Sequence, residues 1–264
     1  MRFDDPLGIP PASGKVYLVG AGPGDPELLT VRAHRLLREA SVVLHDDLVP
    51  QAIVSLAGRH AEVVNVGKRC GAKGTTQEEI NTRMIESARR GLEVVRLKCG
   101  DPGIFGRLAE ELDALAAAHV PFEVVPGITA ALAAAASLGV SLTDRRKSSR
   151  VVIVTGHRAN GKHGDTRWED LVQGDATLAV YMPGQDYEVL QQELLDAGLP
   201  SDIPAAIVSR AAMAGSQQYH TTIGQLGAVP RLEAPAILLI GQSLEPAEQA
   251  SNVVNLPLAD LILS

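Results

Sequence analysis

The chain has 264 residues, of which 45% are hydrophobic, and a formal net charge of −7 at pH 7. This length is enough for two ordinary domains or one large one, and the acidic balance disfavours non-specific nucleic-acid binding, which normally requires an excess of Lys and Arg. No basic-then-apolar leader opens the sequence, and its longest apolar run, residues 128–138, is about half as long as a bilayer span, so we expect a cytoplasmic protein without a membrane partner.

The first half of the chain alternates apolar strand-like runs with amphipathic stretches. After residues 1–13, which we expect to form a flexible leader, this alternation predicts a mostly parallel sheet with helices on its faces. The predicted strands are 15–20, 41–45, 62–66, 92–98 and 121–125. Thr76 and Glu79 predict a capping box at the start of one helix, and Gly91 predicts its end.

The sequence changes in character after Pro126, where an alanine-rich helix and a polar joint at 144–149 precede a second set of strands. These predicted strands are 151–155, 176–181, 204–209, 217–223 and 235–241. We therefore predict an α/β protein of two domains, each a mixed or mostly parallel sheet flanked by helices. The predicted divisions are a leader over 1–13, an N-terminal domain over 14–132, a C-terminal domain over 133–245 and a tail over 246–264.

The loop after the predicted strand 92–98 is the most informative feature of the sequence. Parallel α/β sheets bind ligands outside the carboxyl ends of their strands, where this loop should lie. Gly100, Asp101 and Pro102 supply a backbone without a Cβ, a carboxylate and a fixed turn, which suit a small cationic or zwitterionic ligand. The alternative is that Asp101 forms an Asx-type turn that only closes the loop.

The glycine-rich segment 20–26 partly matches a dinucleotide-binding fingerprint. The final Gly is missing at the required offset, and Pro23 removes an amide donor. Asp25 followed by Pro26 predicts a helix N-cap, whose carboxylate would repel a pyrophosphate at that helix terminus. These departures disfavour a nucleotide-dependent oxidoreductase and leave a structural turn or a different nucleotide-like ligand.

Several separated motifs, in order along residues 15–242, together resemble those of uroporphyrinogen-III C-methyltransferases. They are residues 20–30, Val66-Gly67-Lys68-Arg69, Gln77-Glu78-Glu79-Ile80-Asn81, residues 100–107, Val125-Pro126-Gly127-Ile128-Thr129-Ala130 and Val154-Thr155-Gly156-His157. The resemblance implies a two-domain tetrapyrrole-methylase fold with the active-site cleft between the domains, and a homodimer. It also implies transfer of methyl groups from S-adenosyl-L-methionine to two pyrrole carbons of uroporphyrinogen III. The products would be precorrin-2, which feeds sirohaem and cobalamin synthesis, and S-adenosyl-L-homocysteine.

The resemblance also implies roles for individual residues. The S-adenosyl-methionine contacts would be Pro23, Cys99, Gly100, Asp101, Ile104, Thr129, Ala130, Met182 and Ala211. Asp46 and Lys68 match positions proposed for proton transfer. Methylation of a pyrrole carbon leaves a cation that must lose a proton, so Asp46 at the end of an apolar strand could act as the base. Alternatively, Asp46 caps the next helix.

The tetrapyrrole substrate is rich in carboxylates, which arginine pairs with bidentately. The candidate residues are Arg69, Arg83, Arg107, Arg145 and Arg146. Arg69 and Arg107 are favoured because they close ligand-side motifs, although each of these arginines could equally belong to a solvated helix face.

The sequence departs from the family pattern at positions that shape the pocket. Cys99 and Gly103 stand where the family commonly has Gly and Phe, and Met182 is followed by Pro183 in place of Gly. Two alternatives therefore stay open. One is a methyltransferase of the same fold acting on a later corrin precursor, and the other is a non-catalytic S-adenosyl-methionine-binding module.

No metal site is expected from the sequence. Cys70 and Cys99 form no Cys-x-x-Cys pair, which disfavours both a disulfide scaffold and a structural zinc site. His157 and His163 raise the alternative of a metal-inserting activity. Their spacing is not the helical i, i+4, however, and we interpret them as ordinary loop histidines.

Overall fold

The computed structural model describes residues 14–67, 75–156, 168–171 and 175–245. The chain divides into two compact units, and the division falls between Thr129 and Ala130 in the sequence. The domain boundary expected between 132 and 133 falls inside helix α5 (Ala130–Leu138). The expected leader and tail lie outside the described residues.

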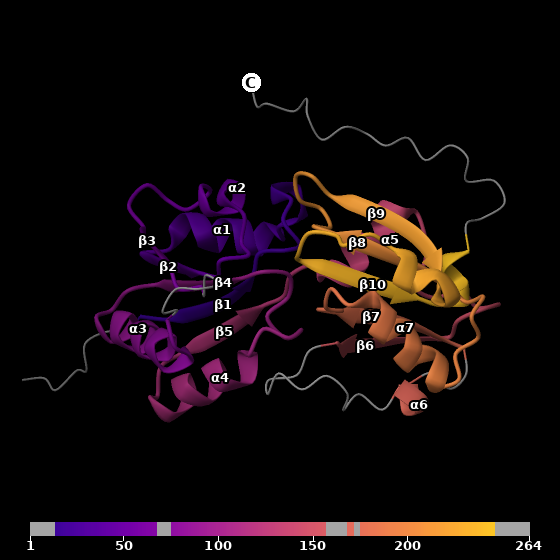
Figure 1. The fold of residues 1–264 in the computed structure, drawn as a ribbon. Coiled ribbons are helices and arrows are strands. Elements are labelled where there is room, and N and C mark those ends of the chain that lie inside the picture. Colours follow the sequence, from indigo (N-terminus) through magenta and orange to yellow (C-terminus); the bar gives the residue numbers. More distant parts are fainter. Residues whose placement is uncertain (1–13, 68–74, 157–167, 172–174, 246–264) are drawn as a thin grey trace, which may run out of the picture. The chain divides into compact units, whose positions relative to one another are not determined.

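The first unit contains a five-stranded parallel sheet in the order β3-β2-β4-β1-β5 (Figure 1). Its strands are β1 (Val16–Gly20), β2 (Val42–His45), β3 (Glu62–Asn65), β4 (Val94–Lys98) and β5 (Phe122–Val125). Each of the strands predicted for this half is confirmed, with ends within two residues. Because every pairing is parallel, the carboxyl ends of these strands lie along one edge of the sheet.

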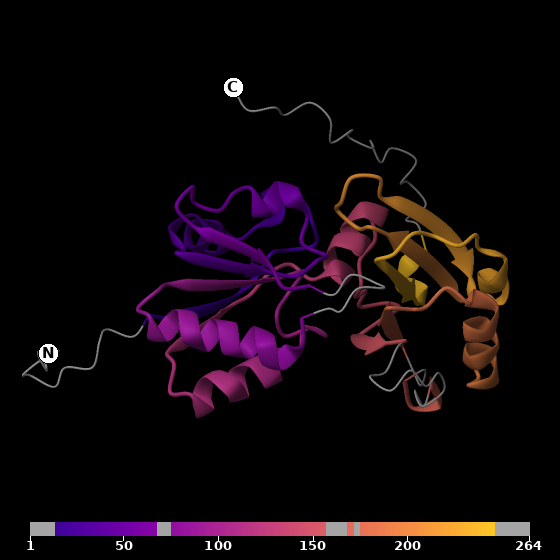
Figure 2. The same cartoon turned by 60° about the vertical axis from the view of Figure 1, so that its left-hand side comes forward.

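Helices cover both faces of this sheet, as Figures 1 and 2 show. On one face lie α1 (Val31–Glu39) and α2 (Gln51–Val54), and on the other α3 (Gln77–Arg89) and α4 (Leu108–Ala117). Leu37 of α1 packs with Val95 of β4, whereas Met84 of α3 packs with Val94, the neighbouring residue on that strand. Successive residues of one strand thus enter two different apolar clusters, as the two-residue period of a strand requires.

The predicted helix ends are largely confirmed. The Thr76 hydroxyl accepts from the backbone of Glu79, whose side chain accepts from the Thr76 amide, forming the expected capping box of α3. Gly91 follows α3 with a φ of 80°, a conformation that favours glycine. Asp25 caps only the short 3₁₀ turn η1 (Pro26–Leu28), and Thr30 caps α1 separately.

The second unit has a mixed sheet in the order β6-β7-β10-β8-β9. Its strands are β6 (Arg150–Thr155), β7 (Ala176–Tyr181), β8 (Pro204–Ser209), β9 (Gln217–Thr222) and β10 (Ala236–Ile240), which confirms the predicted set. β6 pairs in parallel with β7, and the other three pairings are antiparallel. β7 and β8 both run against β10, so the carboxyl ends of β6, β7 and β8 share one edge.

Apolar clusters also lie on both faces of the second sheet. One joins α7 (Tyr187–Asp196) and the 3₁₀ segment η2 (Ile223–Ala228) to the sheet and includes Trp168 of the short α6 (Trp168–Leu171). The other joins α5 and η3 (Gln242–Leu244) to the opposite face. Among the helices of the described ranges, none has the length and apolar character needed to cross a bilayer.

The packing of α1 predicts a contrast between two of its apolar residues. Leu37 is 0% exposed and Val31 is 88% exposed. We expect Leu37→Ala to lower the free energy of unfolding by about 2–5 kcal/mol, because it leaves a cavity, and Val31→Ala to change it by less than about 0.5 kcal/mol. Urea denaturation of both variants measures the difference, and equal destabilisation would contradict this packing.

Candidate active site

Three loops at the carboxyl edge of the first sheet, after β1, β4 and β5, meet backbone against backbone. A Cβ on Gly127 would lie 2.2 Å from the carbonyl oxygen of Gly100, and a Cβ on Gly20 would lie 2.6 Å from the amide nitrogen of Gly127. Real Cβ atoms do not approach so closely, so only glycine fits at either position. Gly22 and Gly100 also exchange two backbone hydrogen bonds, of 3.1 and 2.7 Å. We call these four glycines the glycine junction.

Asp101 ties two of these loops together. Its Oδ1 accepts a hydrogen bond of 2.8 Å from the amide of Gly103, and its Oδ2 accepts one of 3.0 Å from the amide of Gly127. The Asx-type turn considered in the sequence analysis is therefore present, but the carboxylate also joins the loop after β4 to the loop after β5. Each oxygen retains acceptor capacity for a further donor.

The loop after β4 has an unusual backbone. Phe105 and Arg107 adopt φ angles of 52° and 56°, in the left-handed region that non-glycine residues rarely occupy. Between them, a Cβ on Gly106 would meet the carbonyl oxygen of Pro102 at 2.5 Å. Such strain persists only where surrounding contacts impose it, and it clusters at binding and catalytic sites.

Three further predicted cofactor residues lie close in sequence to this junction. Pro23 is buried, Thr129 is half-buried, and Ile104 donates its amide to the carbonyl of Asp101 at 3.2 Å. The side chain of Cys99 packs against the apolar cluster beneath α1 and α2. Burial, with a smaller contribution from the charge of Asp46, raises the pKa of the Cys99 thiol to about 11.

A pocket of about 220 Å³ opens in the first unit at the carboxyl end of β4. Its charged lining residues are Asp46, Arg96, Lys98 and Arg107, and Ile80 and Phe105 contribute apolar surface. The pocket thus combines a carboxylate with three cations.

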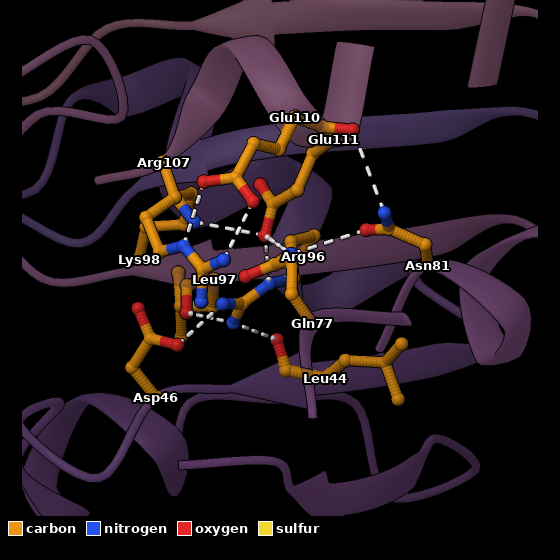
Figure 3. Close-up of polar contacts among 10 residues, drawn as sticks. All are labelled: Leu44, Asp46, Gln77, Asn81, Arg96, Leu97, Lys98, Arg107, Glu110 and Glu111. Atoms are coloured by element: carbon orange, nitrogen blue, oxygen red, sulfur yellow. Dashed lines mark hydrogen bonds and ion pairs between the residues drawn. The ribbon is translucent and has the colours of Figure 1, made fainter. Parts of the chain in front are cut away.

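A buried network of charges forms one wall of this pocket (Figure 3). Arg96 and Lys98 are each 2% exposed and extend from β4 towards α4. Arg96 Nε and Lys98 Nζ both donate to Oε1 of Glu111, each at 2.9 Å, and Gln77 donates to the same oxygen at 3.3 Å. Glu111 is 0% exposed, and its second oxygen, Oε2, has no partner within the described residues.

The surroundings of Lys98 in this network lower its pKa. Desolvation by burial, reinforced by the positive charge of Arg96, lowers the pKa of the Lys98 ammonium, although Glu111 opposes this effect. A buried cation of this kind is held by its counter-ion and not by water.

Asp46 forms an ion pair with the guanidinium of Arg96, and its side chain is 30% exposed. The alternative that Asp46 caps the next helix is wrong, because Pro50 occupies the N-cap position of α2 and no side chain accepts a hydrogen bond there. The structure therefore places the predicted base at the pocket and pairs it with a buried cation. Lys68, the other residue predicted for proton transfer, lies outside the described residues.

Of the arginines considered for substrate binding, Arg107 lines the pocket. Its guanidinium binds Glu110 through hydrogen bonds of 2.8 and 2.5 Å. Arg146 forms an ion pair of 2.8 Å with Asp144, and Arg83 and Arg145 are exposed. The favoured candidate Arg69 lies outside the described residues.

In the second unit, the predicted cofactor residues Met182 and Ala211 follow β7 and β8 at the same edge of the sheet. Met182 has a φ of 48°, and residues 210 and 212, on either side of Ala211, have φ angles of 52° and 55°. Met182 is 48% exposed, whereas Ala211 is buried. The remaining predicted contact, Ala130, is the first residue of α5. The structure thus groups predicted cofactor residues at one edge of each sheet.

Sequence reasoning missed Arg96, Lys98 and Glu111. A signal was available, because two cations at alternate positions of an otherwise apolar strand must share one face of the sheet. A buried counter-charge was therefore required, but its identity depends on which helix covers that face.

No group of three or more His, Cys, Asp or Glu side chains that could hold a metal ion is found in the described part of the chain. His157 and His163 lie outside it.

Comparisons with known proteins agree on one family. The family model described as Tetrapyrrole (Corrin/Porphyrin) Methylases matches residues 15–227. The chain is 44% identical over 237 residues to a siroheme synthase of Nitrosococcus oceani, covering 89% of this chain and 50% of that protein. A siroheme synthase of Pseudomonas fluorescens is 44% identical over 239 residues, covering 89% and 51%. The chain thus spans about half the length of these curated relatives.

Solved structures show the same similarity. A uroporphyrin III C-methyl transferase from Thermus thermophilus is 39% identical with a TM-score of 0.76, covering 88% of this chain and 99% of that one. Another structure of the Thermus enzyme, with the same values, is a complex with S-adenyl homocysteine. A cobalt precorrin-4 methyltransferase is 31% identical with a TM-score of 0.78, covering 88% and 96%.

The environment of Cys99 predicts an unreactive thiol. In a Cys70→Ser variant, which leaves Cys99 as the single cysteine, we expect the alkylation rate to rise only as the pH approaches about 11. Alkylation by iodoacetamide across pH, with urea-unfolded protein as the control, measures this. A midpoint at the ordinary value of 9.0 would contradict the described burial.

Proposed function

The chain belongs to the tetrapyrrole methylase family, and we propose that it methylates two pyrrole carbons of uroporphyrinogen III, with S-adenosyl-methionine as the donor. The products are then precorrin-2 and S-adenosyl-homocysteine, in the route to sirohaem and cobalamin. The observation that carries this proposal is the glycine junction beside a pocket with a paired carboxylate. The similarity to the Thermus enzyme, which was solved with S-adenyl homocysteine, supports it.

The proposed donor has three parts with different needs. Its sulfonium favours nearby carbonyls or a carboxylate, and its amino acid and adenosine need polar partners that fix their orientation. The glycine junction holds the loops after β1, β4 and β5 close together, next to the carboxylate of Asp101. We assign donor binding to Pro23, Cys99, Gly100, Asp101, Ile104, Thr129, Ala130, Met182 and Ala211. Cys99 contributes through its backbone, because its side chain packs into the apolar cluster.

Methyl transfer is an in-line displacement. The bond between sulfur and the methyl carbon breaks, its electron pair stays on sulfur, and a ring carbon supplies the pair for the new bond. Holding the reacting atoms in contact range can contribute as much as about 7–11 kcal/mol. The methylated ring is cationic and returns to neutrality by losing a proton, which we assign to Asp46 with Lys68 as its proton-transfer partner.

Arg107 suits recognition of a substrate carboxylate. Its ion pair with Glu110 is about half-exposed on both sides, and exposed pairs of this kind contribute only about 0–1 kcal/mol. A carboxylate of the tetrapyrrole can therefore replace Glu110 at little cost and keep the bidentate geometry. We assign the same role to Arg69.

A methyltransferase acting on a later corrin precursor is the second candidate. The similarity to the cobalt precorrin-4 methyltransferase favours it, with a TM-score of 0.78. Sequence identity is lower, however, at 31% against 39% for the uroporphyrin III enzyme. Because the fold is shared by both, the sequence carries the distinction and favours uroporphyrinogen III.

We further propose that the protein acts as a homodimer in the cytoplasm. The resemblance of its motifs to those of uroporphyrinogen-III C-methyltransferases supports both statements.

The substrate assignment predicts the mass of the product. Purified protein incubated with S-adenosyl-methionine and anaerobic uroporphyrinogen III should give a tetrapyrrole that is heavier by two methyl groups. Mass spectrometry measures the gain, and protein without the donor is the control. Methylation of a later corrin precursor, but not of uroporphyrinogen III, would support the second candidate.

The donor site predicts a role for Asp101 in binding. Asp101→Ala removes both hydrogen bonds that order the two loops, and bonds to a charged group are each worth about 1.5–3 kcal/mol. We therefore expect affinity for S-adenosyl-homocysteine to fall at least about ten-fold in calorimetry. Asp196→Ala, which removes a carboxylate bonded to Gln192 on α7, is the control. Unchanged affinity in Asp101→Ala would leave the residue a purely structural turn.

A further inference from the structure

We propose that Glu111 is a positioning residue, which acts through Arg96 to fix the carboxylate of Asp46 at the wall of the pocket. The inference rests on the proposed function, because it concerns the residue assigned there to proton removal. It extends that assignment to two buried residues outside the motif residues given roles above.

Arg96 is committed to protein contacts and is not available to a ligand. Its Nε donates to Glu111, one terminal nitrogen donates to the carbonyls of Leu44 at 3.4 Å and Leu97 at 3.3 Å, and the other binds Asp46. Every nitrogen of the guanidinium therefore has a protein acceptor, and the residue is 2% exposed. Because the guanidinium of arginine is planar and rigid, fixing one of its nitrogens against an acceptor also fixes the direction in which the others donate.

Asp46 is the member of this chain of contacts that faces outward. Its side chain is 30% exposed and lines the pocket, whereas that of Glu111 is 0% exposed. Glu111 therefore cannot contact a ligand in the pocket. Any effect of Glu111 on the reaction must pass through the groups that it binds.

One oxygen of Glu111 holds two cations together. Arg96 and Lys98 both donate to Oε1 at 2.9 Å, and the positive charges repel each other without this counter-charge. Removing one member of a buried ion pair leaves an uncompensated charge, which reorganises its surroundings. Without the negative charge of Glu111, we expect Arg96 to lose its fully buried anionic acceptor and to release Asp46 from its present orientation.

The unpartnered Oε2 of Glu111 makes Glu111→Gln a well-matched substitution. The Gln side chain has nearly the same shape and can keep its carbonyl oxygen at the position of Oε1. Its amide group then takes the place of the oxygen that lacks a partner. The substitution removes the negative charge with little change in volume.

A double-mutant cycle tests whether Glu111 acts through Asp46. The enzyme variants are Glu111→Gln, Asp46→Asn and the double variant. The measurement is single-turnover formation of the deprotonated methylated product from uroporphyrinogen III, because Asp46 is assigned to the proton loss that follows methyl transfer. We expect Glu111→Gln to slow product formation by on the order of 10²-fold, as for misplacement of a reacting group. In the Asp46→Asn background it should slow product formation by no more than about two-fold, because the group that it positions is already lost. Affinity for S-adenosyl-homocysteine should stay unchanged.

Glu123→Gln is the matched control. Glu123 on β5 also binds two cations, Lys15 at 2.8 Å and Arg32, and belongs to the same unit. Its replacement removes a shared counter-charge far along the chain from Asp46. We expect Glu123→Gln to form the deprotonated product at the wild-type rate.

The outcomes separate this inference from the proposed function. If the effects of Glu111→Gln and Asp46→Asn multiply, or if Asp46→Asn forms the deprotonated product at the wild-type rate, the inference is wrong while the methyltransferase assignment stands. If wild-type protein methylates no tetrapyrrole, the proposed function is wrong. The crystal structure of Glu111→Gln then decides the inference alone: loss of the contact between Arg96 and Asp46 supports it, and retention overturns it.

If Glu111→Gln folds poorly, the test is made in a second background, Lys98→Met. Lys98→Met with Glu111→Gln removes one positive and one negative buried charge, so the remaining pair of Arg96 and Asp46 is balanced. The same cycle is then run in the Lys98→Met background, with and without Asp46→Asn. Multiplying effects in that background overturn the inference, and non-multiplying effects support it.

Discussion

The candidate site is built on the close backbone packing of the loops that contain Gly20, Gly100 and Gly127. A side chain on Gly20 or Gly127 would enter the space of the neighbouring backbone, with a Cβ on Gly127 only 2.2 Å from the carbonyl of Gly100. The loops after β1, β4 and β5 are therefore held at one place on the edge of the sheet. Asp101 strengthens this arrangement by joining two of them. A ligand at this edge meets loops that are already held in fixed positions, which reduces the ordering cost of binding.

Strand β4 connects this junction to the charged pocket. Val95 and Leu97 enter the cluster beneath α1 and α2, whereas Arg96 and Lys98 point to the opposite face, where Glu111 and Asp46 together balance their charge. The strand continues into the loop that carries Gly100 and Asp101. One strand thus supports the apolar core, the buried charge network and the proposed donor loop, because successive residues alternate between faces. The burial of opposite charges together limits the desolvation penalty that each would have alone.

The sequence was sufficient to predict the strands and several helix ends, because these follow from local patterns. Apolar runs gave all the strands described above, and Thr76 with Glu79 gave the capping box of α3. Sequence patterns were not sufficient for the pairing of Arg96 with Asp46, which is 50 residues away, or with Glu111, which is 15 residues away. Such pairings depend on which strands are neighbours and which helix covers each face. For the same reason, the sequence alone did not exclude Asp46 as a helix cap, whereas the structure does, because Pro50 is the N-cap of α2.

We propose that the glycine junction, with Asp101, holds the methyl donor beside the charged pocket. A crystal structure of this protein with S-adenosyl-homocysteine tests this placement. We expect the sulfur and adenosine to lie against the backbone of residues 99–104 and 127–129, with Asp101 among the contacting residues. Adenosine bound away from these loops, or a junction too closed to admit the ligand, would contradict it.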